Sequence, residues 1–342
     1  MSNQKQLLKL QNVKKFFPVK KGMFQRNKNL VKAVNGINLN VYEGETLGVV
    51  GESGCGKSTL GKVVIGLEKL SDGSIYFNDQ SIGNLPERKL KEYKKDLQMI
   101  FQDPYASLNP RQKIGHALEE IFVIHTNLNK AERKEKVVSL LEEVGLSEEH
   151  YDRYPREFSG GQRQRVGIAR ALALNPSLIV CDEAVSALDV SVQAQVMKLL
   201  KDVQSKYNLT YLFISHDLGV VRYMSDRILV MYLGAQVELG DSEQIYNNPL
   251  HPYTKALLSA IPRPNPKHKR ERIKLQGDLP SASDYPAGCP FHTRCPIATD
   301  RCKEVRPEWR EIEENHFVAC HEVEAIKQTN DDVREDGLKE LV

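Results

Sequence analysis

The sequence predicts an α/β fold, a mostly parallel sheet with helices packed on both faces. Short apolar segments rich in branched side chains alternate along the chain with longer segments of helical periodicity. These apolar segments lack the apolar–polar alternation of a sheet with one solvent-facing side, so we expect them to be buried on both faces. Strands that alternate with helices in this way are typical of α/β domains.

The same patterns place individual strands and helices. The apolar segments that predict strands cover residues 46–50, 177–181, 210–214 and 227–231. The longer patterns that predict helices cover residues 57–66, 130–144, 160–174 and 190–207. The first strand runs into a glycine-rich turn, which the first helix follows directly.

We expect the chain to divide at about residue 240. Its 342 residues suggest two domains, or one large domain with an appendage. Residues 1–240 form the predicted α/β domain, with a helical insertion at about 86–157 where no convincing strand occurs. Residues 241–322 form a proline-richer C-terminal extension that contains a basic connector at 262–272. Residues 323–342 are expected to be a polar, frayed tail.

Composition excludes several classes of protein. Lys and Arg number 48 against 45 Asp and Glu, so the net charge of +3 is far below that of a protein that coats nucleic acid. No nucleic-acid partner is therefore expected. No apolar run approaches the roughly 18–20 residues that cross a bilayer. The polar N-terminus lacks the apolar core of a signal peptide, so we expect a cytosolic protein, in which disulfides are rare.

The glycine-rich turn predicts a site for the phosphates of a nucleotide. Glycines let the backbone wrap closely around phosphate oxygens, while N–H groups and the helix N-terminus supply positive potential. Lys57 is expected to reach the β and γ phosphates, and Ser58 to coordinate Mg²⁺. The turn matches the pattern G-x-x-x-x-G-K-S/T over its full length: Gly51, Glu52, Ser53, Gly54, Cys55, Gly56, Lys57, Ser58 and Thr59.

A second part of this site is expected at the end of another buried strand. Asp182 and Glu183 follow the apolar segment 177–181. Asp182 is suited to hold Mg²⁺ through its water shell. Glu183, one residue further on, is suited to polarise an attacking water as a general base.

Residues 158–165 lie between these two parts and carry the sequence F-S-G-G-Q-R-Q-R. With Ser159, Gly160, Gly161 and Gln162 at its start, this segment resembles the signature sequence of ATP-binding cassette (ABC) ATPases. Other positions match the rest of the cassette pattern: Gln102 the Q-loop, Asp189 the D-loop, His216 the switch histidine, and Phe17 (or else Phe16) the aromatic that stacks on adenine. Ala184 departs from the family, which usually has Pro there.

The resemblance implies a P-loop NTPase fold with a helical subdomain that binds ATP with Mg²⁺. It implies catalytic roles for Lys57, Glu183 and His216. It also implies that Ser58, Gln102 and Asp182 surround the Mg²⁺ ion. The signature residues would meet the γ phosphate bound on a second subunit, so that two ATP molecules join two subunits.

A narrower resemblance concerns the C-terminal extension. Residues 248–262 are similar to the extension of ATPases from oligopeptide and dipeptide importers, and the basic insertion at 20–32 is similar to the OppF/DppF type. Residues 102–110 are also similar to these importer ATPases, and the resemblance as a whole covers residues 5–320. It implies a related second ATPase, two transmembrane permease subunits and an extracellular peptide-binding protein as partners. The chain would then lie on the cytoplasmic face of the membrane as a peripheral subunit.

Three functions compete at this stage. The first is the ATPase subunit of a peptide importer, with nickel or other solute importers of the same subfamily as its variant. The second is a soluble ABC ATPase, which usually carries two cassettes or a long coiled coil, and the sequence predicts neither. The third is a scaffold without activity, which the complete set of Lys57, Asp182, Glu183 and His216 argues against. The transported peptide and the choice between homodimer and heterodimer stay open.

Four cysteines with the spacing C-x5-C-x6-C-x17-C predict a metal centre in the extension: Cys289, Cys295, Cys302 and Cys320. Small loop-rich segments often need such a staple. Four thiolates suit a 4Fe–4S cluster or a zinc ion, and zinc sites usually contain tighter cysteine pairs. The family resemblance also points to a cluster, and free surface thiols are the remaining alternative. Three nearby histidines are possible substitute ligands: His292, His316 and His321.

Overall fold

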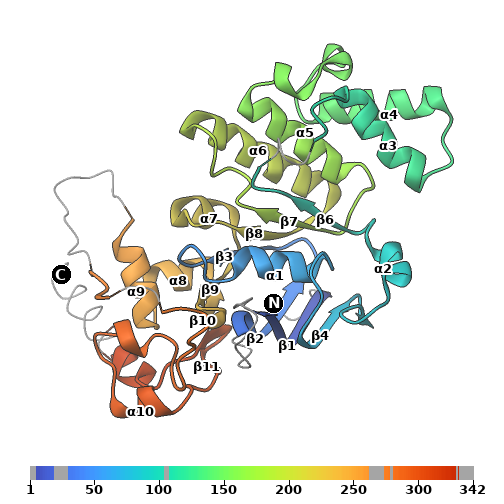
Figure 1. Ribbon diagram of the computed structural model, residues 1–342. Coiled ribbons are helices and arrows are strands. Elements are labelled where there is room, and N and C mark those ends of the chain that lie inside the picture. The colour runs from blue at the N-terminus through green and yellow to red at the C-terminus, as the bar shows by residue number, and fades with distance from the viewer. Residues whose placement is uncertain are drawn as a thin grey trace, which may run out of the picture.

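The computed structural model describes residues 5–18, 30–103, 108–261, 273–277, 280–328 and 330. The basic insertion at 20–32 and the connector at 262–272 therefore lie largely or wholly outside the described residues. Figure 1 shows a central sheet with a helical lobe (α3–α6) at one end, and a second sheet with the C-terminal extension at the other. Among the described helices, none combines the length and the apolar character that a membrane span requires.

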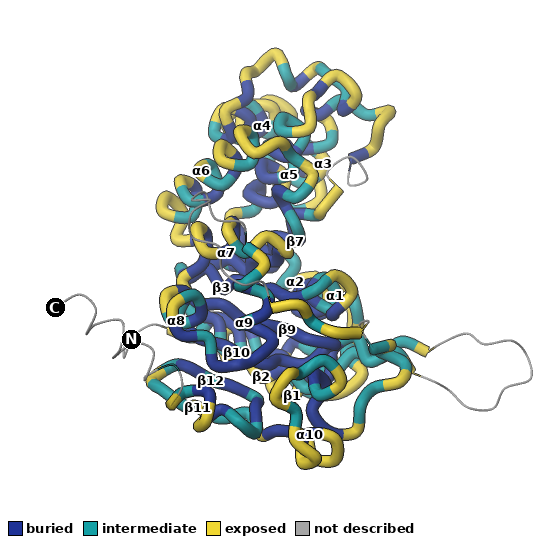
Figure 2. The backbone as a smooth tube through the Cα atoms, turned by 90° about the vertical axis from the view of Figure 1, so that its left-hand side faces the viewer, coloured by how far each residue is buried: buried dark blue, intermediate teal, exposed yellow. Residues whose placement is uncertain are grey.

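The main sheet has eight strands in the order β11-β12-β10-β9-β3-β8-β7-β6. Five neighbouring strands are parallel, from β9 through β3, β8 and β7 to β6 at the edge of the sheet. The bounds of these parallel strands are β3 Thr46–Val50, β6 Leu97–Ile100, β7 Leu178–Asp182, β8 Thr210–Ile214 and β9 Arg227–Tyr232. Figure 2 shows β3 and β9 buried. The four predicted strands are confirmed, because their continuous apolar side chains fill both faces of this sheet.

The expectation that residues 86–157 contain no strand is wrong. β6 lies in this segment and pairs in parallel with β7, with Leu97 opposite Leu178 and Ile100 opposite Cys181. The strand has only four residues and follows a charged stretch. So short a strand gives no clear periodicity, and pairing with β7 rather than local pattern fixes it.

A second, four-stranded sheet packs against helix α1 and was not predicted. Its order is β2-β1-β4-β5, all antiparallel. Its strands are β1 Gln6–Pro18, β2 Leu30–Tyr42, β4 Asp72–Phe77 and β5 Gln80–Ser81. Leu8, Ile37 and Leu60 are fully buried in the core that this sheet shares with α1 (Lys57–Val64) and one face of the main sheet. Helix α1, which begins at the phosphate-binding turn, is therefore held between two sheets.

The other face of the main sheet is covered by the helical lobe and by α7 (Leu218–Met224). Asn129 and Glu132 form a capping box that starts one of the predicted helices. The remaining helices of this part are α2 Glu87–Tyr93, α3 Ile114–His125, α4 Lys130–Glu143, α5 Gly160–Leu172 and α6 Val190–Tyr207, with short 3-10 helices at Glu148–Asp152 and Pro155–Glu157. The four predicted helices are thus confirmed to within two residues at either end.

The C-terminal extension completes the main sheet instead of standing apart from it. β12 (His316–Val318) pairs antiparallel with β10 (Ala235–Asp241), and β11 (Arg310–Glu313) pairs with β12. The predicted boundary after residue 240 therefore falls inside β10. The remaining elements here are α8 Ser242–Asn247, α9 Pro252–Ser259, a 3-10 helix at His292–Arg294 and α10 Asp300–Glu304.

The start of the predicted polar tail is packed, not frayed. Residues 323–328 are helical, and Val323 and Ile326 are buried against Leu250 and Val318. Two apolar residues in a polar stretch are enough to dock a single helical turn, which the composition of the stretch conceals. Residues 331–342 lie outside the described part of the chain.

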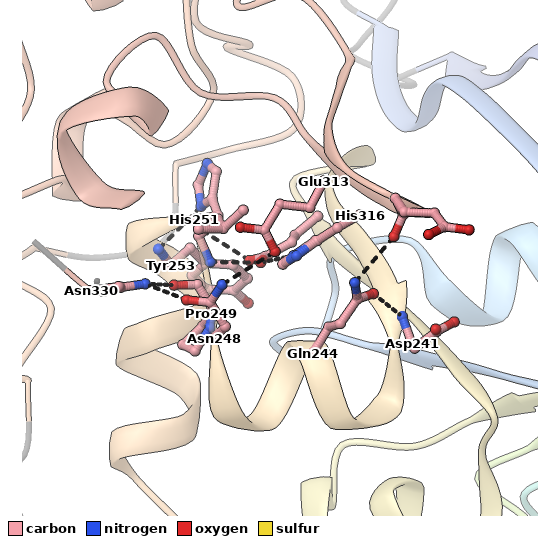
Figure 3. A network of polar contacts seen from close by, with 12 residues as sticks. Asp241, Gln244, Asn248, Pro249, His251, Tyr253, Glu313, His316 and Asn330 are labelled. Atoms are coloured by element: carbon pink, nitrogen blue, oxygen red, sulfur yellow. Dashed lines mark hydrogen bonds and ion pairs between the residues drawn. The ribbon is translucent and has the colours of Figure 1, made fainter. Parts of the chain in front are cut away.

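A buried hydrogen-bonded pair of side chains, Glu238 and His316, holds the extension to β10. The Glu238 carboxylate and the His316 ring are fully buried, with 2.7 Å between Glu238 Oε1 and His316 Nε2. The same carboxylate accepts the N–H groups of Leu250 and His251, at 2.7 and 2.9 Å. His251 Nδ1 in turn accepts the N–H of Tyr253, and burial lowers the pKa of His251 to about 4. Figure 3 shows His251, Tyr253 and His316 close together in this network.

Candidate nucleotide-binding site

The phosphate-binding loop lies between β3 and α1, and two of its glycines are required by close packing. A Cβ on Gly56, where φ is +105°, would lie 1.9 Å from the Ala33 carbonyl oxygen. A Cβ on Gly51, where φ is +150°, would lie 2.2 Å from the Met231 carbonyl oxygen. The loop therefore passes tightly between β2 and β9, and larger residues would displace its backbone.

Lys57 is the only buried lysine among the described residues, at 4% exposure. Its Nζ donates to the carbonyl oxygens of Gly51, at 2.7 Å, and Glu52, at 3.0 Å. The amine therefore lies folded over the loop, where a phosphate would approach. Residues 53, 54 and 59 occupy the loop and the first turn of α1, while the Cys55 side chain is buried beneath the loop.

Ser58 and Asp182 meet although they are 124 positions apart. The Ser58 hydroxyl donates to Asp182 Oδ1 at 2.7 Å. Asp182 is 5% exposed, and burial raises the pKa of its carboxyl while the Ser58 hydrogen bond opposes that effect. A buried carboxylate with a hydroxyl beside it is the donor set that a Mg²⁺–phosphate complex uses, so these residues fit the predicted ion.

The Glu183 carboxylate is held from two sides. Gln102 Nε2 donates to Glu183 Oε2 at 2.9 Å, and His216 Nδ1 lies 3.3 Å from Glu183 Oε1. The Glu183 backbone has φ of +48°, a left-handed conformation that its N–H group supports by bonding to the Ile214 carbonyl at 2.9 Å. Strained positions of this kind are most often found at functional sites. The structure thus brings together three predicted residues from the ends of three neighbouring strands.

The signature segment opens helix α5 and faces solvent. Ser159 is its N-cap, and Ser159 and Gln162 form a capping box. Ser159 and Gly160 are exposed. A Cβ on Gly161 would lie 2.4 Å from Val192 Cγ1, so glycine lets α5 approach α6 closely. Asp189, the predicted D-loop residue, stands at the N-cap of α6.

Phe17 lies near the end of β1, opposite Val31 of β2. Its ring is half-buried, and Lys15 Nζ lies 4.7 Å from the ring centroid. The ring therefore keeps an accessible face on the second sheet.

The predicted metal centre is not supported by the side-chain positions. Within the described ranges, no group of three or more His, Cys, Asp or Glu side chains is placed to hold a metal ion. The thiols of Cys289, Cys295, Cys302 and Cys320 are free, yet they share one neighbourhood. Burial raises the pKa of Cys320 to about 12, and the other three cysteines act in the same direction.

The three histidines proposed as substitute ligands have other partners. His316 is paired with Glu238 as described above. His292 Nδ1 lies 2.8 Å from the Cys289 carbonyl oxygen, and His321 Nε2 lies 2.9 Å from the Val305 carbonyl oxygen. These contacts fix backbone turns in the extension, so the rings have structural roles.

Contacts between the extension and the phosphate-binding loop were not predicted from the sequence. Glu52, a variable position of the loop motif, forms an ion pair with Arg294 and donates its N–H to the Tyr253 hydroxyl. Glu52 and Arg294 are 242 positions apart, so no local pattern could connect them. The only available signal in the sequence was an acidic residue in a loop predicted to bind phosphate.

The site and the fold together define an ABC ATPase. The ABC transporter family model matches residues 34–186, and a second model, for the C-terminal region of oligopeptide/dipeptide transporters, matches residues 237–302. Among solved structures, the post-hydrolysis dimer of the ATP-binding cassette MJ0796 bound to ADP and Pi is 29% identical. It covers 69% of this chain and 99% of its own, with a TM-score of 0.62.

Curated relatives narrow this class. The oligopeptide transport ATP-binding protein AppF of Bacillus subtilis is 56% identical over 94% of this chain and 98% of its own length. The dipeptide transport ATP-binding protein DppF of Escherichia coli is 50% identical over 94% and 96%. The chain belongs to the family of oligopeptide/dipeptide transport ATP-binding proteins.

Proposed function

We propose that this protein is the ATP-hydrolysing subunit of an importer of oligopeptides or dipeptides. The observation that carries the proposal is the convergence of Gln102, Glu183 and His216 beside the Ser58–Asp182 pair. Membership of the peptide-transport family supplies the class of cargo. In this proposal the cassette extends through β10, its helical insertion begins after β6, and the residues that follow β10 form the peptide-importer extension.

Different residues of the chain would have different roles in ATP hydrolysis. Bound ATP supplies the phosphoryl group, and Mg²⁺ neutralises its charge. Lys57 would move from the loop carbonyls to the phosphate oxygens, while Ser58 and Asp182 would hold the ion. Glu183 would accept a proton from water, with Gln102 and His216 keeping its carboxylate in place. Phe17 would stack on the adenine ring.

A second ATPase subunit would complete each site. Ser159 and Gly160 present an exposed helix N-terminus, whose N–H groups suit a phosphate bound on a partner. Asp189 would lie at the same junction. The structural neighbour is described as a dimer, which agrees with a site shared between two cassettes. We propose a related but non-identical subunit as that partner.

A groove beside the Q-loop is the proposed contact for a permease subunit. The groove has a volume of about 490 Å³ and is lined by one side of α3, by Leu108 and by Gln98, four residues before Gln102. At the end of α3, Val123 and Ile124 are 56% and 58% exposed. Exposed apolar side chains next to a groove mark an interaction surface. Docking there would place the chain on the cytoplasmic face of the membrane as a peripheral subunit.

Purification of the assembled transporter tests this proposal. We expect two permeases, one copy of this chain and one copy of a related ATPase, with ATP hydrolysis stimulated when a peptide-loaded binding protein is added. Quantitative mass spectrometry of the intact complex gives the copy numbers. Recovery of two copies of this chain, with no second ATPase, would refute the heterodimer. Hydrolysis that peptide-loaded binding protein does not change would refute the coupling to peptide import.

We also propose that Cys289, Cys295, Cys302 and Cys320 bind a metal centre, a 4Fe–4S cluster in preference to zinc. The proposal rests on four free thiols in one neighbourhood and on the family resemblance. The side chains must rotate to surround a metal, and the thiols must lose protons, so metal uptake should weaken as pH falls.

Anaerobic purification is expected to give brown protein that contains iron and sulfide. Cys302→Ser should remove the colour and destabilise the extension, while Cys181→Ala, which lies in the core of β7, should keep the colour. Iron, zinc and sulfide analyses provide the measurement. Stoichiometric zinc without iron would reject the cluster, and protein without any metal would reject the site.

A further inference from the structure

The C-terminal extension contacts the phosphate-binding loop at Glu52, through Arg294 and Tyr253. Arg294 binds the Glu52 carboxylate with two nitrogens, at 2.7 and 3.1 Å from Oε2 and Oε1. The Tyr253 hydroxyl accepts the Glu52 N–H at 2.8 Å. Both partners come from the part of the chain beyond β10, outside every motif of the nucleotide site. A paired, two-nitrogen contact with a carboxylate is directional as well as strong.

The two partners of Glu52 are held rigidly. The rings of Tyr232, Tyr253 and Phe291 are fully buried and pack edge-on, with Tyr232–Tyr253 centroids 4.7 Å apart and Tyr232–Phe291 centroids 5.2 Å apart. Arg294 follows Phe291 by one helical turn, and its side chain is 9% exposed. Packed aromatic rings fix the positions of both groups that contact Glu52.

Tyr253 is also connected to the buried Glu238–His316 pair of the extension. Its N–H donates to His251, whose own N–H donates to Glu238, the partner of His316. Figure 3 shows Tyr253 beside His251 in this network. A continuous series of hydrogen bonds therefore runs from the β10–β12 pairing to the backbone of the phosphate-binding loop.

Glu52 in turn connects to Lys57. The Glu52 carbonyl oxygen accepts Lys57 Nζ at 3.0 Å and the Cys55 N–H at 3.2 Å. A shift of the Glu52 backbone would move an oxygen to which the lysine amine is bonded and would change the curvature of the loop. The conformation of Glu52 is therefore coupled to the groups that meet the phosphates.

We propose that Arg294 and Tyr253 are positioning residues that hold the phosphate-binding loop in the shape required for ATP, so that the C-terminal extension sets the affinity of the site. The inference rests on the proposed ATPase function. It assigns to the extension a role in nucleotide binding in addition to any contact with other subunits. A side chain that merely stabilised the fold would lower the melting temperature without acting through Glu52.

Equilibrium binding of Mg²⁺–ATP to the full-length chain tests the inference, with Glu183→Gln as the parent so that ATP is not consumed. Arg294→Ala should raise the Kd for ATP by about tenfold, a typical loss for a hydrogen bond to a charged group. Arg294→Lys, which keeps the charge but not the two-nitrogen contact, should fall between the parent and Arg294→Ala. Tyr253→Phe should raise the Kd by a smaller factor.

A matched control is available in the same extension. Arg310 pairs with Glu324 in an exposed contact, so Arg310→Ala removes an arginine ion pair without touching the loop. Its Kd for ATP should equal that of the parent. In the assembled transporter with Glu183 intact, Arg294→Ala should raise KM for ATP while kcat stays within about twofold, as expected when uniform binding is lost.

A double-mutant cycle with Glu52→Gln identifies the route. If Arg294 acts through Glu52, the double variant should bind ATP no more weakly than Arg294→Ala alone. Losses that multiply in the double variant would overturn the inference, as would a parent-like Kd in Arg294→Ala. If Arg294→Ala fails to fold, Arg294→Lys takes its place in the cycle with Glu52→Gln. The double variant should then bind ATP no more weakly than Arg294→Lys alone. Absence of ATP binding in the parent would instead refute the proposed function itself.

Discussion

Glu183→Gln is expected to reduce ATP hydrolysis by about 10²–10⁴-fold, the usual contribution of a general base. The amide keeps the shape of the carboxylate and its hydrogen bond to Gln102 can be retained, but it cannot accept a proton from water. Lys57, Ser58 and Asp182 are untouched, so ATP should still bind and the two ATPase subunits should stay joined by nucleotide. Steady-state phosphate release from the purified transporter measures the first effect, and nucleotide retention measures the second.

A glutamate outside the site provides the control for this change. Glu143 accepts hydrogen bonds from Lys206 and Tyr207 at the surface of the helical lobe. Glu143→Gln removes the same charge and should leave hydrolysis unchanged. Multiple-turnover hydrolysis at the wild-type rate in Glu183→Gln would show that another group accepts the proton. Loss of ATP binding in that variant would show that the substitution disturbs the loop.

Lys57→Ala is expected to weaken ATP binding by about 10- to 100-fold, the range for hydrogen bonds to a charged group. The substitution removes the cation that we propose contacts the phosphates, and it leaves the Gly51 and Glu52 carbonyl oxygens without the Lys57 donor. Hydrolysis should fall at all practical ATP concentrations because the site is seldom occupied. Titration with Mg²⁺–ATP gives the Kd, and thermal unfolding tests whether the loop remains folded.

Lys89→Ala is the comparison for the lysine change. Lys89 is exposed on α2, so its removal alters the net charge equally without touching the site. ATP affinity equal to the wild type is expected for Lys89→Ala. Equal affinity in Lys57→Ala would contradict the assignment of Lys57 to the phosphates.

Contiguous features were predictable from the sequence because they are local. The turn from β3 into α1 carries its glycines, its lysine and its hydroxyl within nine residues. Asp182 meets Ser58 because parallel strands end at one edge of the sheet, whereas Gln102 and His216 were predicted from their resemblance to the ABC cassette pattern. The ends of α6 matched the prediction because Asp189 is its N-cap and Asn208 is its C-cap.

What escaped prediction depends on distant pairs. β6 is too short to show a period, and only its pairing with β7 makes it a strand. From the sequence alone, Glu238 is a polar residue of an edge strand. It is buried only because His316, 78 positions away, pairs with it. The cysteine spacing predicted a metal centre, but among the described residues the four thiols are not placed to hold a metal ion. The contact of Arg294 with Glu52 belongs to the same group.

The pairing of β10 with β12 couples the unfolding of the cassette to that of the extension. Removal of everything after β10 would expose the open edge of a long sheet, strip Glu238 of its partner and uncover Tyr232. Open strand edges invite aggregation. The cassette and the extension should therefore melt as one cooperative unit, and protease cuts that release the extension should also release the cassette to degradation. A gene truncated after β10 would therefore not encode a smaller functional ATPase.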